Sequence, residues 1–362
     1  MKKSMTLLLA VALVMMLLAG CTGTTVVIGE CTCPPDSHSN TPVVDVPAVD
    51  SPVAEGAVKT GLAVVTSISD STSATADASG AAKYDITIAA VTVDDAGVIT
   101  ACTIDSVPAT VEFDATGTIT TDLAAEIRTK GEQGADYGMV AWGGAIAEWD
   151  EQVAALAQFA VGKTVEELKS GAIDETGKAP AGSDLASSAT IYLGGYVSAI
   201  EAAAANAQHL GAQAGDELVL ATLNEVSSST SATAEAEGLA QLDANIAVVT
   251  RKDGVITSCI IDAVQAKIAF DATGAITTDL TAPVATKNEL GENYGMVAWG
   301  GAIAEWNEQA ASFASYVTGK TAAEVAGIAV TETTKPADGT DLASSVTIAI
   351  GGFMALIAKA MQ

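Results

Sequence analysis

The sequence Tyr137-Gly138-Met139-Val140-Ala141-Trp142-Gly143-Gly144-Ala145-Ile146-Ala147-Glu148-Trp149 occurs twice, letter for letter, and its second copy runs from Tyr294 to Trp306. All four tryptophans of the chain lie in these two copies, at a separation of 299 − 142 = 157 residues. Tryptophan is the largest apolar side chain, and its N–H usually needs a partner when the ring is buried. The block therefore predicts either the centre of each core or the wall of a binding site, and the sequence leaves both open.

The repeated block belongs to two domain-sized repeats. Residues 102–190 align with the second copy without a gap, whereas the upstream match of Ser73 with Ser231 needs a shift that is one residue larger. This difference falls at Asp94–Gly97, where turn residues separate two runs of β-branched residues. A slip inside a strand would turn its side chains to the other face, so the difference predicts a hairpin turn here.

Each repeat is predicted to be an α+β unit. We expect strands at Tyr84–Val93 and Val98–Asp105, a helix from Ala145 to Val161, and a short helix that a capping box of Thr164 and Glu167 begins. The predicted fold is two tandem homologous domains, each an antiparallel sheet with two or three helices, after a lipoprotein signal and a disordered tether. The predicted boundaries are 1–20 for the signal peptide, 21–58 for a low-complexity tether, 59–208 for the first repeat and 209–362 for the second.

The first residues predict export and a lipid anchor. A basic start and an apolar run lead to Leu18-Ala19-Gly20-Cys21, which resembles the lipobox of bacterial lipoproteins. By this resemblance Cys21 would be lipidated and would become the mature N-terminus. The expected location is the extracytoplasmic face of the cell membrane, to which the lipid anchor would attach the protein.

Composition excludes several classes of function. The chain has 16 basic and 44 acidic residues and a formal net charge of −28, so nucleic acid is excluded as a partner. Its only two histidines, His38 and His209, fall in the tether and the connection between the repeats. A Ser-His-Asp triad is therefore excluded, and no metal site is predicted. An electron carrier or a binding protein is favoured over an enzyme.

The end of each repeat carries a motif. It reads Asp184-Leu185-Ala186-Ser187-Ser188-Ala189-Thr190 in the first repeat and Asp341-Leu342-Ala343-Ser344-Ser345-Val346-Thr347 in the second. With the hairpin upstream, it resembles the FMN-binding domain of bacterial extracytoplasmic electron-transfer proteins, whose motif is Asp-x-x-Ser-Gly-Ala-Thr. In that family a dedicated flavin transferase joins FMN to the threonine through a phosphoester bond.

The resemblance implies a membrane-anchored protein that binds FMN and relays electrons. Its partners would be a flavin transferase and a membrane quinone or NADH oxidoreductase. Trp142 and Trp299 would stack on the isoalloxazine ring, and Lys130 and Lys287 would lie near the phosphate. The implied cofactor-binding residues are Thr190, Thr347, Ser187, Ser344, Asp184, Asp341, Trp142, Trp299, Tyr137, Tyr294, Lys130 and Lys287.

Several features also have ordinary structural explanations. Ser188 and Ser345 replace the family's glycine, which counts against covalent attachment because glycine usually supplies an unusual backbone angle or room for close approach. Thr190 could instead cap a helix, Lys130 could form a surface pair with Glu132, and Glu148 could lie on a solvated helix face. The alternative function is a non-catalytic surface or solute-binding lipoprotein without flavin.

Overall fold

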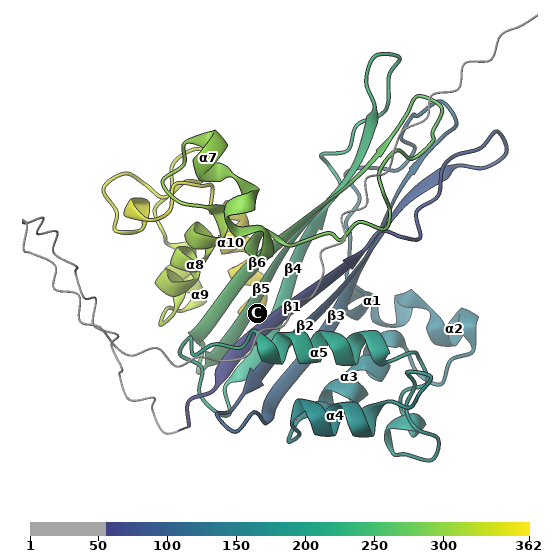
Figure 1. The fold of residues 1–362 in the computed structure, drawn as a ribbon. Helices are drawn as coiled ribbons and strands as arrows, with labels where there is room; N and C mark the ends of the chain where they lie inside the picture. Colours follow the sequence, from purple (N-terminus) through teal and green to yellow (C-terminus); the bar gives the residue numbers. More distant parts are fainter. Residues whose placement is uncertain (1–55) are drawn as a thin grey trace, which may run out of the picture. The chain divides into compact units, whose positions relative to one another are not determined.

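The structure is a computed structural model that describes residues Gly56–Gln362. The predicted signal peptide, the lipidation site Cys21 and almost all of the predicted tether lie outside the described residues. In the described part, each repeat forms a three-stranded antiparallel sheet followed by helices, which confirms the predicted α+β fold (Figure 1). The strands are β1 Lys59–Ser67, β2 Gly80–Val93 and β3 Ile99–Phe113, then β4 Glu217–Glu225, β5 Gly238–Lys252 and β6 Val255–Phe270.

The predicted hairpin connects β2 to β3. Asp94 closes the turn, because its side-chain Oδ1 accepts hydrogen bonds from the backbone N–H groups of Ala96 and Val98, both at 2.9 Å. The strands are longer than predicted, since β3 continues through Pro108 to Phe113. After a turn at Asp114–Gly117 the chain folds back on the end of β3, where the Thr120 N–H donates to the carbonyl of Glu112 at 2.9 Å.

Helices follow each sheet in the same order. The helices of the first repeat are α1 Lys130–Gln133, α2 Met139–Gly143, α3 Trp149–Ala160, α4 Val165–Ala172 and α5 Gly194–Ala205, and those of the second are α6 Lys287–Leu290, α7 Met296–Gly300, α8 Trp306–Val317, α9 Ala322–Ala326 and α10 Gly351–Ala360. Figure 1 shows α3, α4 and α5 on one side of the first sheet. The predicted capping box of Thr164 and Glu167 begins α4. The long helix begins at Trp149 and not at Ala145, because Glu148 caps its start.

Each sheet is buried on both faces, since alternate side chains of a strand point in opposite directions. On β2, Ala89 and Val91 pack against the helices of their own repeat, whereas Ile86 and Ile88 join a core to which both repeats contribute. In this shared core Phe113 stacks on Phe270, with ring centroids 4.0 Å apart and planes 2° from parallel. The two rings occupy equivalent positions of the repeats, so this contact is self-complementary.

Backbone hydrogen bonds also join the repeats reciprocally. The N–H of Ala74 donates to the carbonyl of Gly274 at 2.8 Å, and the N–H of Ala232 donates to the carbonyl of Gly117 at 2.8 Å. All described residues belong to one compact unit. The repeats therefore share one core, and each also packs a core of its own between its sheet and its helices.

Candidate functional site

The two tryptophans of each identical block have opposite environments. Trp149 and Trp306, at the start of α3 and α8, are only 3% and 6% exposed and belong to the cores between sheet and helices. Trp142 and Trp299, on α2 and α7, are 85% and 86% exposed. The block thus provides a core residue and a surface residue at once, and the core interpretation is confirmed for Trp149 and Trp306.

Glu148 was expected on a solvated helix face, and that prediction is wrong. Its carboxylate is buried and accepts hydrogen bonds from the backbone N–H groups of Met139 at 2.8 Å and Val140 at 3.1 Å. Four N–H groups at the start of a helix lack partners within the helix, and an acidic side chain can satisfy them. Glu148 therefore fixes the short helix α2 against the start of α3, and Glu305 makes the same contacts in the second repeat.

Lys130 lies in an aromatic frame. Its Nζ is 5.6 Å from the centroid of the Tyr137 ring and 5.5 Å from that of Trp149, within the range of cation–π attraction. The side chain is buried, and its Nζ lies 3.6 Å from the Asp85 carboxylate on β2. The expected surface pair of Lys130 with Glu132 is therefore wrong.

A pocket of about 400 Å³ opens beside this lysine. Its wall is largely aromatic, and the indole N–H of Trp149 donates to the hydroxyl of Tyr196 at 2.9 Å. Burial raises the pKa of Tyr196, while the hydrogen bond from Trp149 and the charge of Lys130 act in the opposite direction. The pocket is lined by Thr87, Lys130, Tyr137, Met139, Trp149, Ile191, Tyr192, Gly195 and Tyr196.

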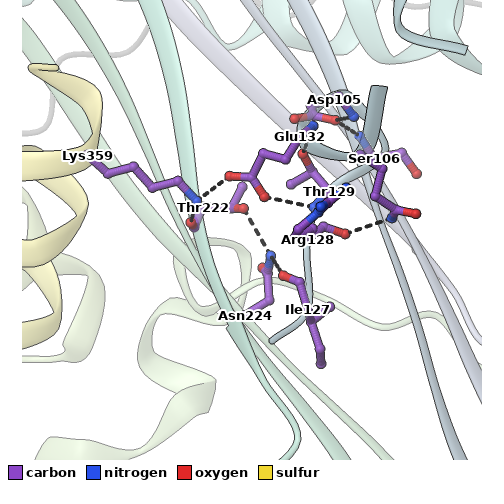
Figure 2. A network of polar contacts seen from close by, with 11 residues as sticks. Asp105, Ser106, Ile127, Arg128, Thr129, Glu132, Thr222, Asn224 and Lys359 are labelled. Carbon is purple, nitrogen blue, oxygen red and sulfur yellow. Dashed lines mark hydrogen bonds and ion pairs between the residues drawn. The ribbon is translucent and has the colours of Figure 1, made fainter. Parts of the chain in front are cut away.

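A polar network holds the helix that carries Lys130 (Figure 2). Thr129 and Glu132 form a capping box at the start of α1, with Thr129 N–H donating to Glu132 Oε2 at 2.9 Å. The other oxygen of Glu132 pairs with Lys359 of the second repeat, which also donates to the carbonyl of Thr222 at 2.7 Å. The N–H of Gly131, the residue after Lys130, donates to the carboxylate of Asp105 at 2.9 Å. The position of Lys130 is thus fixed from both repeats.

The loop with the Asp184–Thr190 motif is fastened to α3 by a buried glutamine. Gln152 Oε1 accepts hydrogen bonds from the N–H groups of Thr190 at 2.8 Å and Ile191 at 3.3 Å, and from the Thr190 hydroxyl at 3.3 Å. Its Nε2 donates to the carbonyl of Ala147 at 2.9 Å. The Thr190 hydroxyl thus faces an amide oxygen instead of capping a helix, and Ile191 beside it lines the pocket.

The second repeat keeps this loop but changes the walls of the site. Gln309 makes the same contacts to Thr347 and Ile348 as Gln152 makes in the first repeat. The positions of Tyr192 and Tyr196, however, are occupied by Ala349 and Phe353. The second repeat therefore keeps only some of the residues that line the pocket of the first repeat.

The structure brings only some of the predicted residues together. Lys130 and Tyr137 line one pocket, Lys287 and Tyr294 are neighbours in the second repeat, and Thr190 directly precedes the pocket residue Ile191. The other predicted residues, Trp142, Trp299, Asp184, Asp341, Ser187 and Ser344, are exposed, and those of the first repeat do not line this pocket. In the motif, the Ser187 hydroxyl donates to the carbonyl of Asp184 at 2.6 Å, which closes a turn.

The residues that sequence reasoning missed are Trp149, Gln152, Tyr196 and Asp85. Trp149 and Gln152 are identical in both repeats, and this was the signal that could have found them. Asp85 carried the same signal, because its counterpart in the second repeat is Asp243. Tyr196 carried none, because its counterpart is Phe353 and its role depends on a helix packing beside a distant tryptophan.

Other candidate chemistry is limited in the described residues. Within Gly56–Gln362 no group of three or more histidine, cysteine or acidic side chains is placed to hold a metal ion. Burial raises the pKa of Cys259 to about 12, so its thiol stays protonated near neutral pH. None of the helices in this part of the chain is both long and apolar enough to span a bilayer.

Comparison of the chain with protein-family models, with curated proteins and with solved structures gives no match in any of the three cases. The two repeats therefore stand as similar tandem units of antiparallel sheet and helices, and their resemblance to FMN-binding domains rests on the residues quoted above.

Proposed function

We propose that this protein holds FMN and relays electrons on the extracytoplasmic face of the membrane, anchored there through Cys21. One observation carries the proposal. A pocket with aromatic walls and a lysine lies directly beside the loop whose motif resembles the flavin attachment site. FMN would supply the redox chemistry when bound, and the protein would supply position and electrostatics.

The pocket residues fit such a group. Tyr137, Trp149 and Tyr196 offer the apolar and aromatic surface that a planar ring system needs, and about 400 Å³ lies within the usual range for small-molecule sites. Lys130 offers a cation at the edge of this surface. The ring would be received by the aromatic walls, and Thr190 directly precedes the lining residue Ile191 on the loop that Gln152 fastens.

The most direct test is colour and mass. The full chain, purified from a host that has the flavin transferase, should absorb blue light, and its mass should show one or two added FMN groups if attachment is covalent. Thr190→Ala should remove the group from the first repeat only. If attachment is not covalent, FMN at a hundredfold excess over Kd should stabilise the protein by about 2.7 kcal/mol.

Controls separate the pocket from the exposed tryptophan. Tyr196→Ala should weaken the thermal shift caused by flavin, whereas Trp142→Ala should leave it unchanged, because Trp142 does not line the pocket. A protein that gains neither colour, mass nor stability from flavin would refute the proposal. The flavin transferase and a membrane quinone or NADH oxidoreductase are the partners that it implies.

The second candidate is a surface or solute-binding lipoprotein without flavin. The exposure of Trp142 and Trp299 favours it, since tryptophan is enriched at interfaces with other molecules. A panel of sugars and peptides tested by thermal shift, beside the flavins, would distinguish the two candidates.

A further inference from the structure

The two repeats place equivalent lysines in similar aromatic frames. Lys287 Nζ lies 5.0 Å from the ring centroids of both Tyr294 and Trp306, which matches the frame of Lys130 in the first repeat. Both lysines directly follow the threonine of a capping box at the start of a short helix. The two lysines therefore occupy equivalent positions, each as the first residue of a short helix.

The charges that surround the two lysines differ. Lys130 has the carboxylate of Asp85 at 3.6 Å. In the described residues, no carboxylate oxygen lies within 4.0 Å of Lys287 Nζ, and this Nζ donates no hydrogen bond to another residue. Lys130 is therefore paired with a carboxylate of the protein and Lys287 is not.

A pair of glutamines explains this difference. The counterpart of Asp85 is Asp243, whose two oxygens accept hydrogen bonds from Gln241 Nε2 at 2.7 Å and Gln265 Nε2 at 2.9 Å. In the first repeat these positions are Lys83 and Pro108, neither of which carries an amide side chain. Asp243 is thus held by two amides along the sheet, whereas the Asp85 oxygen that lies 3.6 Å from Lys130 accepts a hydrogen bond only from the Ser106 hydroxyl, at 2.8 Å.

We propose that Lys287 is an anion site and that Lys130 is not, so the two repeats recognise different parts of a ligand. The aromatic faces attract the ammonium group of Lys287 more weakly than a charged hydrogen-bond acceptor would, so they leave it available to a phosphate. On the proposed function, on which this inference rests, the second repeat selects the phosphate of FMN. The first repeat takes the flavin ring without regard to the phosphate.

FMN and riboflavin test this division, because they differ only in the phosphate. Calorimetric titration of the full chain should show two flavin sites, one of which prefers FMN. Lys287→Met should reduce that preference by about ten- to a hundredfold, as expected for the loss of a hydrogen bond to a charged group, and should leave riboflavin affinity unchanged. Lys130→Met is the matched control and should preserve the preference.

Two further variants move the charge without removing a lysine. Asp85→Asn should give the first repeat a preference for FMN, and the double variant Gln241→Leu with Gln265→Leu should release Asp243 and weaken the preference of the second. Equal affinity for FMN and riboflavin at both sites, or a preference that depends on Lys130 alone, would overturn the inference. Unchanged melting temperatures of the lysine variants show that their folds are intact.

Inorganic phosphate keeps the inference separate from the proposed function. If neither flavin binds, the proposed function fails, but phosphate should still change the fluorescence of Trp306 in the unaltered chain and not in Lys287→Met. A phosphate titration that is the same for both proteins would reject the anion site.

Discussion

Replacing Phe113 by alanine should destabilise both repeats together. The ring is fully buried and stacks on Phe270 at 4.0 Å, at the point where equivalent positions of the two repeats meet. Truncating a buried phenylalanine costs about 3–5 kcal/mol, which for a unit of this size is a fall in Tm of about 5–8 °C. Because the core is shared, we expect one cooperative transition in which neither repeat unfolds first.

The buried tryptophans allow each repeat to be followed by itself. Variants that keep only Trp149 or only Trp306 report on the core of the first or the second repeat, since each ring is packed between its own sheet and helices. Urea and thermal unfolding followed by fluorescence should give the same midpoint for both reporters. In each background Phe113→Ala should lower that midpoint by the same amount.

A shift seen by Trp149 but not by Trp306 would refute the shared core and would restore two independent domains. Phe270→Ala should match Phe113→Ala in size, and the double variant should cost less than the sum of the two, by about 0.5–1.5 kcal/mol for the lost aromatic pair. Val65→Ala on the exposed side of β1 is the control and should change stability by no more than about 0.5 kcal/mol.

Three other predictions follow from buried polar groups. Gln152→Leu leaves the backbone N–H groups of Thr190 and Ile191 without an acceptor. At about 1–3 kcal/mol for each such group, the free energy of unfolding measured in urea should fall by about 3–5 kcal/mol. The control Gln158→Ala, at an exposed position of the same helix, should leave it almost unchanged. Tyr84→Phe should hold or raise Tm, because the buried Tyr84 hydroxyl has no hydrogen-bond partner among residues Gly56–Gln362 and removing it leaves none of their polar groups unsatisfied. Burial raises the pKa of Asp262 from 3.8 to about 6, so the folded state holds this proton more tightly than the unfolded state. The resulting stability, on the order of 3 kcal/mol, is present at about pH 4 and is lost as the pH rises through 6. Asp262→Asn should flatten that part of the pH profile of stability measured by chemical denaturation.

The sequence predicted the features that local chemistry determines. The one-residue difference between the repeats located the β2–β3 turn, because only a turn accepts such a change without reversing the faces of a strand. Thr164 with Glu167 predicted the start of α4 for a similar reason, since a capping box acts within three residues. Both features needed no knowledge of the rest of the chain.

The features that were not predicted depend on contacts between distant segments. Alternation along β2 shows which residues share a face, but it does not show that the other repeat covers that face. The same holds for Glu148, whose helical context suggested a solvated face, although its carboxylate satisfies N–H groups of a preceding helix. Asp85 and Lys130 meet only because β2 pairs with β3, against which α1 packs.

Duplication helps to separate what the fold requires from what it does not. Trp149, Glu148 and Gln152 are identical in both repeats, and each has a packing or hydrogen-bonding role that explains why. Trp142 is also identical in both, yet its ring is almost fully exposed and only lies over Gly138, where a Cβ would come within 3.0 Å of the indole. Burial therefore does not account for its presence in both copies, and Trp142 and Trp299 are the exposed side chains to test for a contact outside this chain.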